Sequence, residues 1–168
     1  MAQVDFLSIG NALAARYGPL VVTPPTGESP IQRVGLSSLT LGTSSGVDRP
    51  VVLSRFPCVL VLPAGGTFTT GAGERAGHHD WLIRFFYRLF PDSTKHPAPL
   101  HAWLSQLVNL PHLTDAQLVV STVPLVSYVR VDAWRIPEQG LTYAGTVYEG
   151  IELTVHTLTN EGWTPTAS

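Results

Sequence analysis

Charge is scarce in this sequence, and lysine is almost missing. Charged side chains make up 13% of the 168 residues, against an average of about 25% in globular domains. The net charge of −2 provides no basic surface for nucleic acid. Lys95 is the one lysine among ten basic residues; arginine suits interface ion pairs, although a GC-rich genome produces the same bias. A surface this poor in charge indicates either obligate assembly or a monomer coated in Ser, Thr and Pro.

Two further absences limit covalent and membrane chemistry. Cys58 is the only cysteine, so no disulfide can form within the chain, and its apolar neighbours predict an inert core residue. No stretch approaches the ~18 apolar residues of a membrane span, and the N-terminus lacks the basic start of a signal peptide. We therefore expect a soluble protein that is made and used in the cytoplasm.

Apolar residues make up 44% of the chain, which at this length is enough for one sizeable core. The periodicities predict an α+β fold: a mixed or mainly antiparallel β-sheet flanked by an N-terminal helix and a central helix. We expect a single domain over residues 1–168. It consists of a helix at 2–17, an extended arm at 20–50, a sheet-and-helix body at 51–158 and a short polar tail.

Two stretches have helical periodicity. Residues 2–17 place an apolar stripe at i, i+3, i+7 and i+11, and a Gly-Pro pair ends the helix. The stripe consists of Phe6, Ile9, Leu13 and Tyr17. The second helix opens at Pro99 and extends to about Leu110. Its apolar side consists of Leu100, Trp103, Leu104, Leu107 and Val108.

The arm at 20–50 is dominated by Pro, Gly, Ser and Thr, which disfavour regular structure. Within it, residues 31–41 carry enough apolar side chains for one short strand or an extended docked segment. Ordered loops of this length are uncommon in compact domains and tend to be functional. We predict that a neighbouring subunit orders the arm; the alternative is a surface loop that packs on its own domain.

The chain is organised around two apolar strands and the segment between them. Residues 58–62 form a continuous apolar run, typical of a buried strand. Residues 64–78 contain five glycines, and their spacing does not match a dinucleotide-binding fingerprint. We predict a mobile hairpin loop here that contacts a partner on assembly. Its contact residues are Gly73, Glu74, Arg75, His78 and His79.

Residues 81–90 alternate as a strand does, although a helix also fits ten apolar-rich residues. One face of this strand is apolar throughout. The other face places arginines between apolar side chains, a mixture that suits a subunit contact. We predict an interface in which a neighbouring subunit supplies carboxylates and apolar surface. It consists of Arg84, Phe86, Arg88 and Phe90.

The C-terminal part of the chain reads as strands and turns. We expect a short strand at 118–123, an alternating strand at 127–134, a turn at 137–140 and a long final strand through 147–155. In the alternating strand, the inward residues are predicted to be Val129, Val131 and Ala133.

No pattern in the sequence indicates a catalytic or metal centre. His78, His79 and Asp80 form the densest cluster among six histidines, but neighbours on a strand point to opposite faces. No histidine pair has helical zinc-site spacing, and there is no G-x-S-x-G motif. The remaining candidate carboxylates fit outward strand positions and turns: Asp132, Glu138, Glu149 and Glu152. We expect no enzyme activity, metal or cofactor; the alternative is a small α+β enzyme or ligand-binding domain with its site beneath residues 64–78.

The order of elements resembles that of the tail terminator proteins of long-tailed bacteriophages over nearly the whole chain. The resemblance is carried by Phe56-Pro57-Cys58-Val59-Leu60-Val61-Leu62, by His79-Asp80-Trp81-Leu82-Ile83-Arg84-Phe85, by the helix that bears Trp103, and by Tyr143-Ala144-Gly145-Thr146-Val147-Tyr148-Glu149-Gly150. These are features of layout, and the arm at 20–50 is longer than the plain pattern of that family.

The resemblance implies a structural virion protein that forms a ring, usually a hexamer, which caps the tail tube and joins it to the head connector. Its implied partners are further copies of itself, the tail tube protein and the head–tail connector proteins, with no membrane and with DNA only passing through the lumen. It implies a place in the tail or neck of the virion after assembly in the host cytoplasm, and no catalytic residues to carry over. Another connector or completion protein of the neck is the alternative within the structural class.

Overall fold

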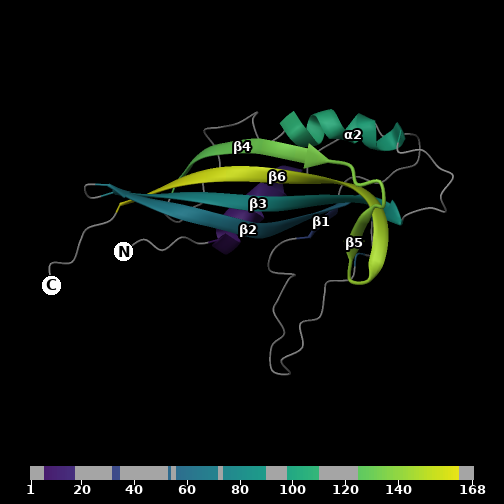
Figure 1. Cartoon of the computed structure of the whole chain (residues 1–168), viewed down its shortest axis with the longest axis horizontal. Coiled ribbons are helices and arrows are strands. Elements are labelled where there is room, and N and C mark those ends of the chain that lie inside the picture. Colours follow the sequence, from purple (N-terminus) through teal and green to yellow (C-terminus); the bar gives the residue numbers. More distant parts are fainter. Residues whose placement is uncertain are drawn as a thin grey trace, which may run out of the picture.

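A computed structural model describes residues 6–17, 32–34, 53, 56–71, 74–89, 98–109 and 125–162. Its elements, in chain order, are α1 (Phe6–Tyr17), β1 (Gln32–Val34), β2 (Cys58–Gly71), β3 (Glu74–Leu89), α2 (Ala98–Asn109), β4 (Leu125–Arg135), β5 (Leu141–Tyr143) and β6 (Thr146–Gly162). Figure 1 shows a long twisted sheet with α1 behind it and α2 along the β4 side. Neither of the two described helices has the length and apolar character needed to span a membrane.

The strands form one sheet in the order β1-β2-β3-β6-β4, and β5 pairs with the N-terminal end of β6. β1 runs parallel to β2, and every other described pair is antiparallel. β3 and β6 are the central strands and pair along almost their whole lengths. The predicted α+β fold, with a mainly antiparallel sheet and an N-terminal and a central helix, is confirmed.

Both helices contribute to one apolar core on one face of the sheet, because alternate residues of the central strands are apolar there. Trp81, Ile83 and Phe85 of β3 are fully buried in this core. Trp103 of α2 lies against Phe85, with ring centroids 5.2 Å apart. Each large apolar side chain buried in this way contributes about 1.5–3 kcal/mol. The helices depend on that packing, since helices of this length are marginal on their own.

The apolar stripes predicted for the helices point into this core. In α1 the stripe is buried except at its first residue, Phe6, which is 40% exposed. α2 buries Leu100, Trp103 and Leu107, while Leu104 is half-buried against the same cluster. The sequence pattern therefore predicted which side of each helix packs.

A smaller apolar cluster covers one end of the opposite face. It consists of Leu53, Cys58, Leu60, Phe86, Leu141 and Tyr148. The β5–β6 hairpin supplies part of it and curves away from the other strands (Figure 1). Its two turn residues, Ala144 and Gly145, have φ values of 50° and 78°, and a type I′ turn requires positive φ at both positions. Cys58 is free and 1% exposed, which confirms the expectation of a core cysteine, and burial raises the pKa of its thiol to about 12.

The prediction of a loop over residues 64–78 is wrong. β2 continues to Gly71 and β3 begins at Glu74, so the two strands form one long hairpin, and residues 72 and 73 lie outside the described part. β6 pairs with the other side of β3 as far as Glu74. Main-chain hydrogen bonds do not need large side chains, so a segment rich in glycine and threonine is held as a strand by its backbone.

Other predictions fall partly outside the described residues. The parts that lie outside are residues 2–5 of the first helix, most of the arm, the strand at 118–123 and the polar tail beyond 162. β1 confirms a short strand within the arm, and β4 and β6 confirm the two C-terminal strands. Ala133 is exposed and not inward, because a bulge between Val131 and Ala133 shifts the register there. β5 was missed, since three residues are too few to show a period.

Candidate functional site

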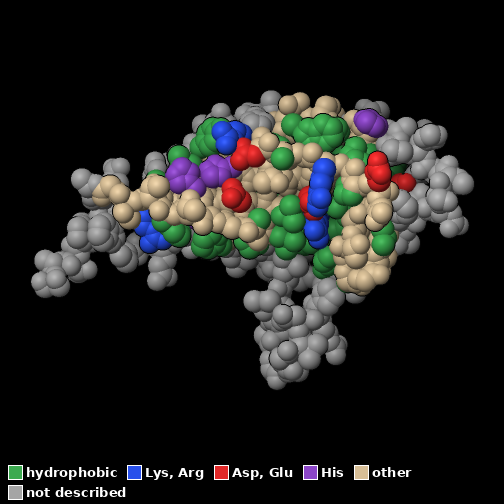
Figure 2. Space-filling model, in the orientation of Figure 1, with side chains coloured by type: hydrophobic (Ala, Val, Ile, Leu, Met, Phe, Trp, Pro, Cys, Tyr) green, Lys and Arg blue, Asp and Glu red, His purple; other side chains and the backbone are tan. Residues whose placement is uncertain are grey.

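Polar side chains gather on the face of the sheet that neither described helix covers. Figure 2 shows this face, with histidine and acidic side chains toward one end and an arginine–glutamate group near the middle. They come from β3, β6 and β4, because alternate residues of adjacent strands stand on the same face. The set is His78, Asp80, Arg84, Arg130, Asp132, Arg135, Glu152 and His156.

Glu152 is the centre of the first polar group. It is 6% exposed and lies opposite Arg84 on β3 and Arg135 on β4. Arg84 Nε donates a hydrogen bond to Oε2 at 2.9 Å, and Arg135 Nε donates one to Oε1 at 2.6 Å. Because each carboxylate oxygen accepts a charge-assisted bond, Glu152 ties three strands together.

An open depression of about 550 Å³ adjoins the Glu152 group. The residues of that group line one side, and residues 137–142 of the turn and β5 line the other. The turn is closed by a hydrogen bond from Gly140 N to Pro137 O at 3.0 Å, and Gly140 has a φ of 75°, which favours glycine. The depression is open to solvent and does not enclose a small molecule as a typical ligand pocket does.

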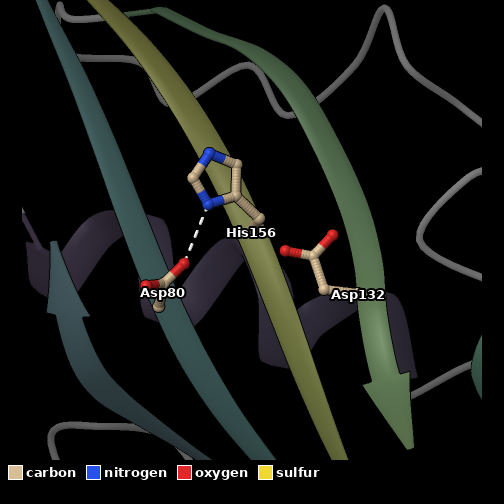
Figure 3. Close-up of side chains that lie close together, drawn as sticks. All are labelled: Asp80, Asp132 and His156. Atoms are coloured by element: carbon tan, nitrogen blue, oxygen red, sulfur yellow. Dashed lines mark hydrogen bonds and ion pairs between the residues drawn. The ribbon is translucent and has the colours of Figure 1, made fainter. Parts of the chain in front are cut away.

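His156 is the centre of the second polar group. Its Nδ1 lies 2.8 Å from Oδ1 of Asp80, and its Nε2 lies 3.3 Å from Nδ1 of His78. Asp132 approaches from β4, so that one ligand atom each from Asp80, Asp132 and His156 lies within 4.8 Å of the others (Figure 3). Arg130 forms an exposed ion pair with Asp132. This group brings two carboxylates and two imidazoles together on the open face.

His79 lies on the other, helix-covered face of the sheet. It is 1% exposed, and its Nε2 forms a hydrogen bond with Oγ1 of Thr159 at 2.9 Å. Burial, followed by repulsion from His156, His78 and Arg75, lowers the pKa of His79 below its ordinary value. His79 is therefore a neutral core histidine. Because neighbouring residues of a strand point to opposite faces, His79 lies on the other side of the sheet from His78 and Asp80.

Two of the predicted interface residues have their partners in the same chain. Phe86 is fully buried in the smaller apolar cluster, and Arg84 is paired with Glu152. The carboxylate and the apolar surface expected from a neighbouring subunit are thus supplied by β6 and the β5–β6 hairpin, whose positions the spacing along β3 cannot reveal. The side chain of Arg88 and the whole of Phe90 lie outside the described residues, and their place in an interface stays a prediction.

The predicted contact residues of the hairpin divide between the two faces. They are Gly73, Glu74, Arg75, His78 and His79. The Arg75 guanidinium lies over the ring of Phe68, 3.6 Å from the centroid, on the same face as His79. His78 belongs to the opposite face, beside His156. Gly73 lies outside the described residues, and only the backbone of Glu74 is described.

The outer half of β2 is an exposed sheet edge. β1 pairs with β2 only from Cys58 to Leu60, and no other described strand lies on that side. All nine residues from position 63 to 71 are exposed, and none of them carries a charge. Natural edges usually carry charges, bulges or proline against pairing with other chains. In this edge, the only such features are Pro63 and a bulge between Pro63 and Gly65, at the start of the exposed segment. The residues from 66 to 71 have no charge, bulge or proline that would oppose pairing with another chain.

The opposite edge of the sheet, β4, has a different chemistry. Two bulges interrupt its pairing with β6, and its exposed charged side chains are Arg130, Asp132 and Arg135. Two aromatic side chains, Tyr128 and Trp134, are 38% and 53% exposed. The two edges of one sheet therefore present unlike surfaces, one uncharged and glycine-rich, the other charged and aromatic.

Sequence reasoning missed the group around His156. The residues of this group are even-numbered polar residues of β3, β6 and β4, which the sequence shows. That they lie next to one another can be predicted only when the pairing register of the three strands is known. In comparisons with known proteins, no family model matches this sequence and no curated protein matches it.

Proposed function

We propose that this protein is the structural subunit of a closed ring that caps the tail tube of a long-tailed bacteriophage and joins it to the head connector. The observation that carries the proposal is the exposed, uncharged edge of β2 at residues 63–71. Such an edge presents a row of N–H and C=O groups and is a template for pairing with another chain. The tail-terminator role rests on the order of elements along the chain, which resembles that of this phage family.

A closed ring needs two different complementary patches on each subunit, because its interface is heterologous. The β2 edge is the first patch. The β4 edge is the second, since it carries the exposed rings of Tyr128 and Trp134 and aromatic residues are enriched at interfaces. β2 and β4 lie toward opposite sides of the same sheet, so contact between them would carry the sheet from one subunit to the next.

The open face and the composition also favour a structural role. Glu152 is held by two arginines and links the central strands to β4. The low content of charge suits a surface that is largely covered in an assembly. Arg88, Phe90 and the arm at 20–50 stay in the proposal as further contacts with neighbours.

The test adds one positive charge at either of two exposed threonines. Thr69→Lys places a lysine in the β2 edge, and Thr142→Lys places one on β5, away from that edge. Sedimentation velocity measures assembly, and circular dichroism measures the fold. We expect the wild type and Thr142→Lys to form a hexamer and Thr69→Lys to remain a folded monomer, because an edge lysine opposes strand pairing.

Equal assembly of the two lysine variants would remove the β2 edge from the interface. The terminator role has its own readout, which is the length of tubes polymerised from the tail tube protein in the presence of the ring. Rings that leave tube length unchanged would indicate another connector protein of the neck. A wild-type chain that stays monomeric even beside the tube protein would contradict the ring itself and favour a ligand-binding domain.

A further inference from the structure

We propose that Asp80, Asp132 and His156 form a binding site for a divalent transition-metal ion of the Zn²⁺, Co²⁺ and Mn²⁺ group. Their ligand atoms lie within 4.8 Å of one another. Figure 3 shows the imidazole of His156 on β6 between the two carboxylates, which come from β3 on one side and β4 on the other. The inference stands on this cluster and does not depend on the proposed ring.

The backbone register brings the three residues together. Asp80 lies directly opposite His156 in the β3–β6 ladder. On β4, a bulge between Val131 and Ala133 leaves Asp132 without a partner in the β4–β6 ladder. Bulges re-aim the side chain of the extra residue, and the carboxylate of Asp132 turns toward His156 (Figure 3). The site is therefore built by two strand pairings and one irregularity.

The donor set suits ions of this class. One imidazole nitrogen and two carboxylate oxygens combine the ligand types preferred by zinc and by manganese, and the two carboxylates offset the charge of a divalent ion. Metal–ligand bonds of about 2.1 Å place neighbouring ligand atoms roughly 3.4 Å apart. The Asp80 and Asp132 side chains are 48% and 32% exposed, so they can rotate to close the remaining gap without disturbing the core.

His78 supplies an outer partner for the second ring nitrogen of His156. When Nδ1 of His156 binds the ion, its Nε2 carries the hydrogen and faces Nδ1 of His78 at 3.3 Å. A bond from one ring nitrogen to such a partner fixes the orientation of the metal-bound ring. Arg130 pairs with Asp132, and because a carboxylate has two oxygens, one can accept from Arg130 while the other binds the ion.

The ion pair between His156 and Asp80 does not by itself account for this arrangement. A hydrogen bond between His156 and Asp80 requires neither the approach of Asp132 from β4 nor the placement of His78 at the second ring nitrogen. Each ring nitrogen of His156 has a polar partner, Nε2 facing His78 and Nδ1 facing Asp80. The carboxylates near the ring come from both neighbouring strands, β3 and β4. These two features point to a coordinated cation.

The test titrates the full-length protein with Zn²⁺ by calorimetry and with Co²⁺ by visible absorption. The variants are Asp132→Asn and His156→Gln. The control is His101→Gln, because His101 is an exposed histidine on α2, a helix that supplies none of the three ligands. We expect the wild type and the control to bind one ion per chain and to melt at a higher temperature with Zn²⁺. The two site variants should lose at least about tenfold in affinity and lose the Co²⁺ absorption.

Wild-type protein that shows no saturable binding overturns the proposal, and so does His156→Gln with wild-type affinity. A loss in His101→Gln equal to that in His156→Gln would also overturn it, since it would show general binding to histidines. Circular dichroism of the metal-free variants checks their fold. If His156→Gln does not fold, the exposed Asp132→Asn variant decides the question.

Discussion

Arg84 and Glu152 face each other across the two central strands, and the Nε of Arg84 donates a hydrogen bond to Oε2 of Glu152 at 2.9 Å. The Glu152 side chain is 7% exposed and that of Arg84 is 26% exposed. Arg84→Gln should therefore lower the free energy of unfolding by about 1–3 kcal/mol, because a buried carboxylate loses a charged partner. Urea denaturation followed by circular dichroism measures the loss.

Arg135 provides the matched control, since it bonds the other oxygen of the same carboxylate. Its side chain is 68% exposed, and exposed ion pairs contribute about 0–1 kcal/mol. We expect Arg135→Gln to cost less than Arg84→Gln. If the two variants lose the same free energy of unfolding, burial does not determine the strength of the two ion pairs. If Arg84→Gln is as stable as the wild type, Arg84 again becomes a candidate for a subunit contact.

The Cys58 thiol gives a second prediction, on pH. Burial raises its pKa from 9.0 to about 12. The unfolded thiol therefore ionises first as pH rises, so the stability that depends on the neutral thiol is complete below pH 9 and is lost between pH 9 and 12. From pH 8 to pH 10, wild-type protein should lose roughly 1 kcal/mol more of unfolding free energy than Cys58→Ala. Parallel pH profiles of the two proteins would contradict this, as would rapid thiol modification of the folded wild type at pH 8.

Gly150 gives a third prediction, because β6 passes so close to β3 there that no side chain fits. An added Cβ would lie 2.2 Å from the carbonyl oxygen of Phe85 and 2.7 Å from Cδ1 of Leu141. Gly150→Ala should cost about 1–3 kcal/mol or more, since backbone atoms would have to move. At Gly65 nothing lies within 4 Å of an added Cβ, and Gly65→Ala should be neutral or slightly stabilising. Thermal denaturation of the pair measures the difference, and equal melting temperatures would refute the close approach.

Much of the fold was predictable because it follows from one-sided burial. The stripe of α1, the buried side of α2 and the apolar alternation that contains Trp81, Ile83 and Phe85 are each visible in a single segment. The hairpin beyond Leu62 was misread as a loop for a physical reason. Its composition resembles that of a turn, whereas its structure depends on main-chain bonds to β3, and β3 is in turn held by β6.

The candidate sites were less predictable than the fold. The sequence drew attention to Asp80 and to the histidines beside it, but it did not show that Asp132 and His156 lie near Asp80. It also assigned the partner of Arg84 to another subunit, whereas Glu152 of the same chain fills that place. In both cases the missing information was which residue lies opposite, and that is a property of the pairing register.

By itself the sequence determined the types of element and the faces that they bury, because the 2-residue and 3.6-residue periods are local properties of the chain. It also determined that charge would be scarce and that Cys58 would be a core thiol. Only the tertiary structure decided that Asp80, Asp132 and His156 meet, that Glu152 lies between two arginines, and that no other described strand pairs with the outer half of β2. These relationships depend on strand order, register and a bulge, which are selected by the free energy of the whole sheet and not by any one segment of it.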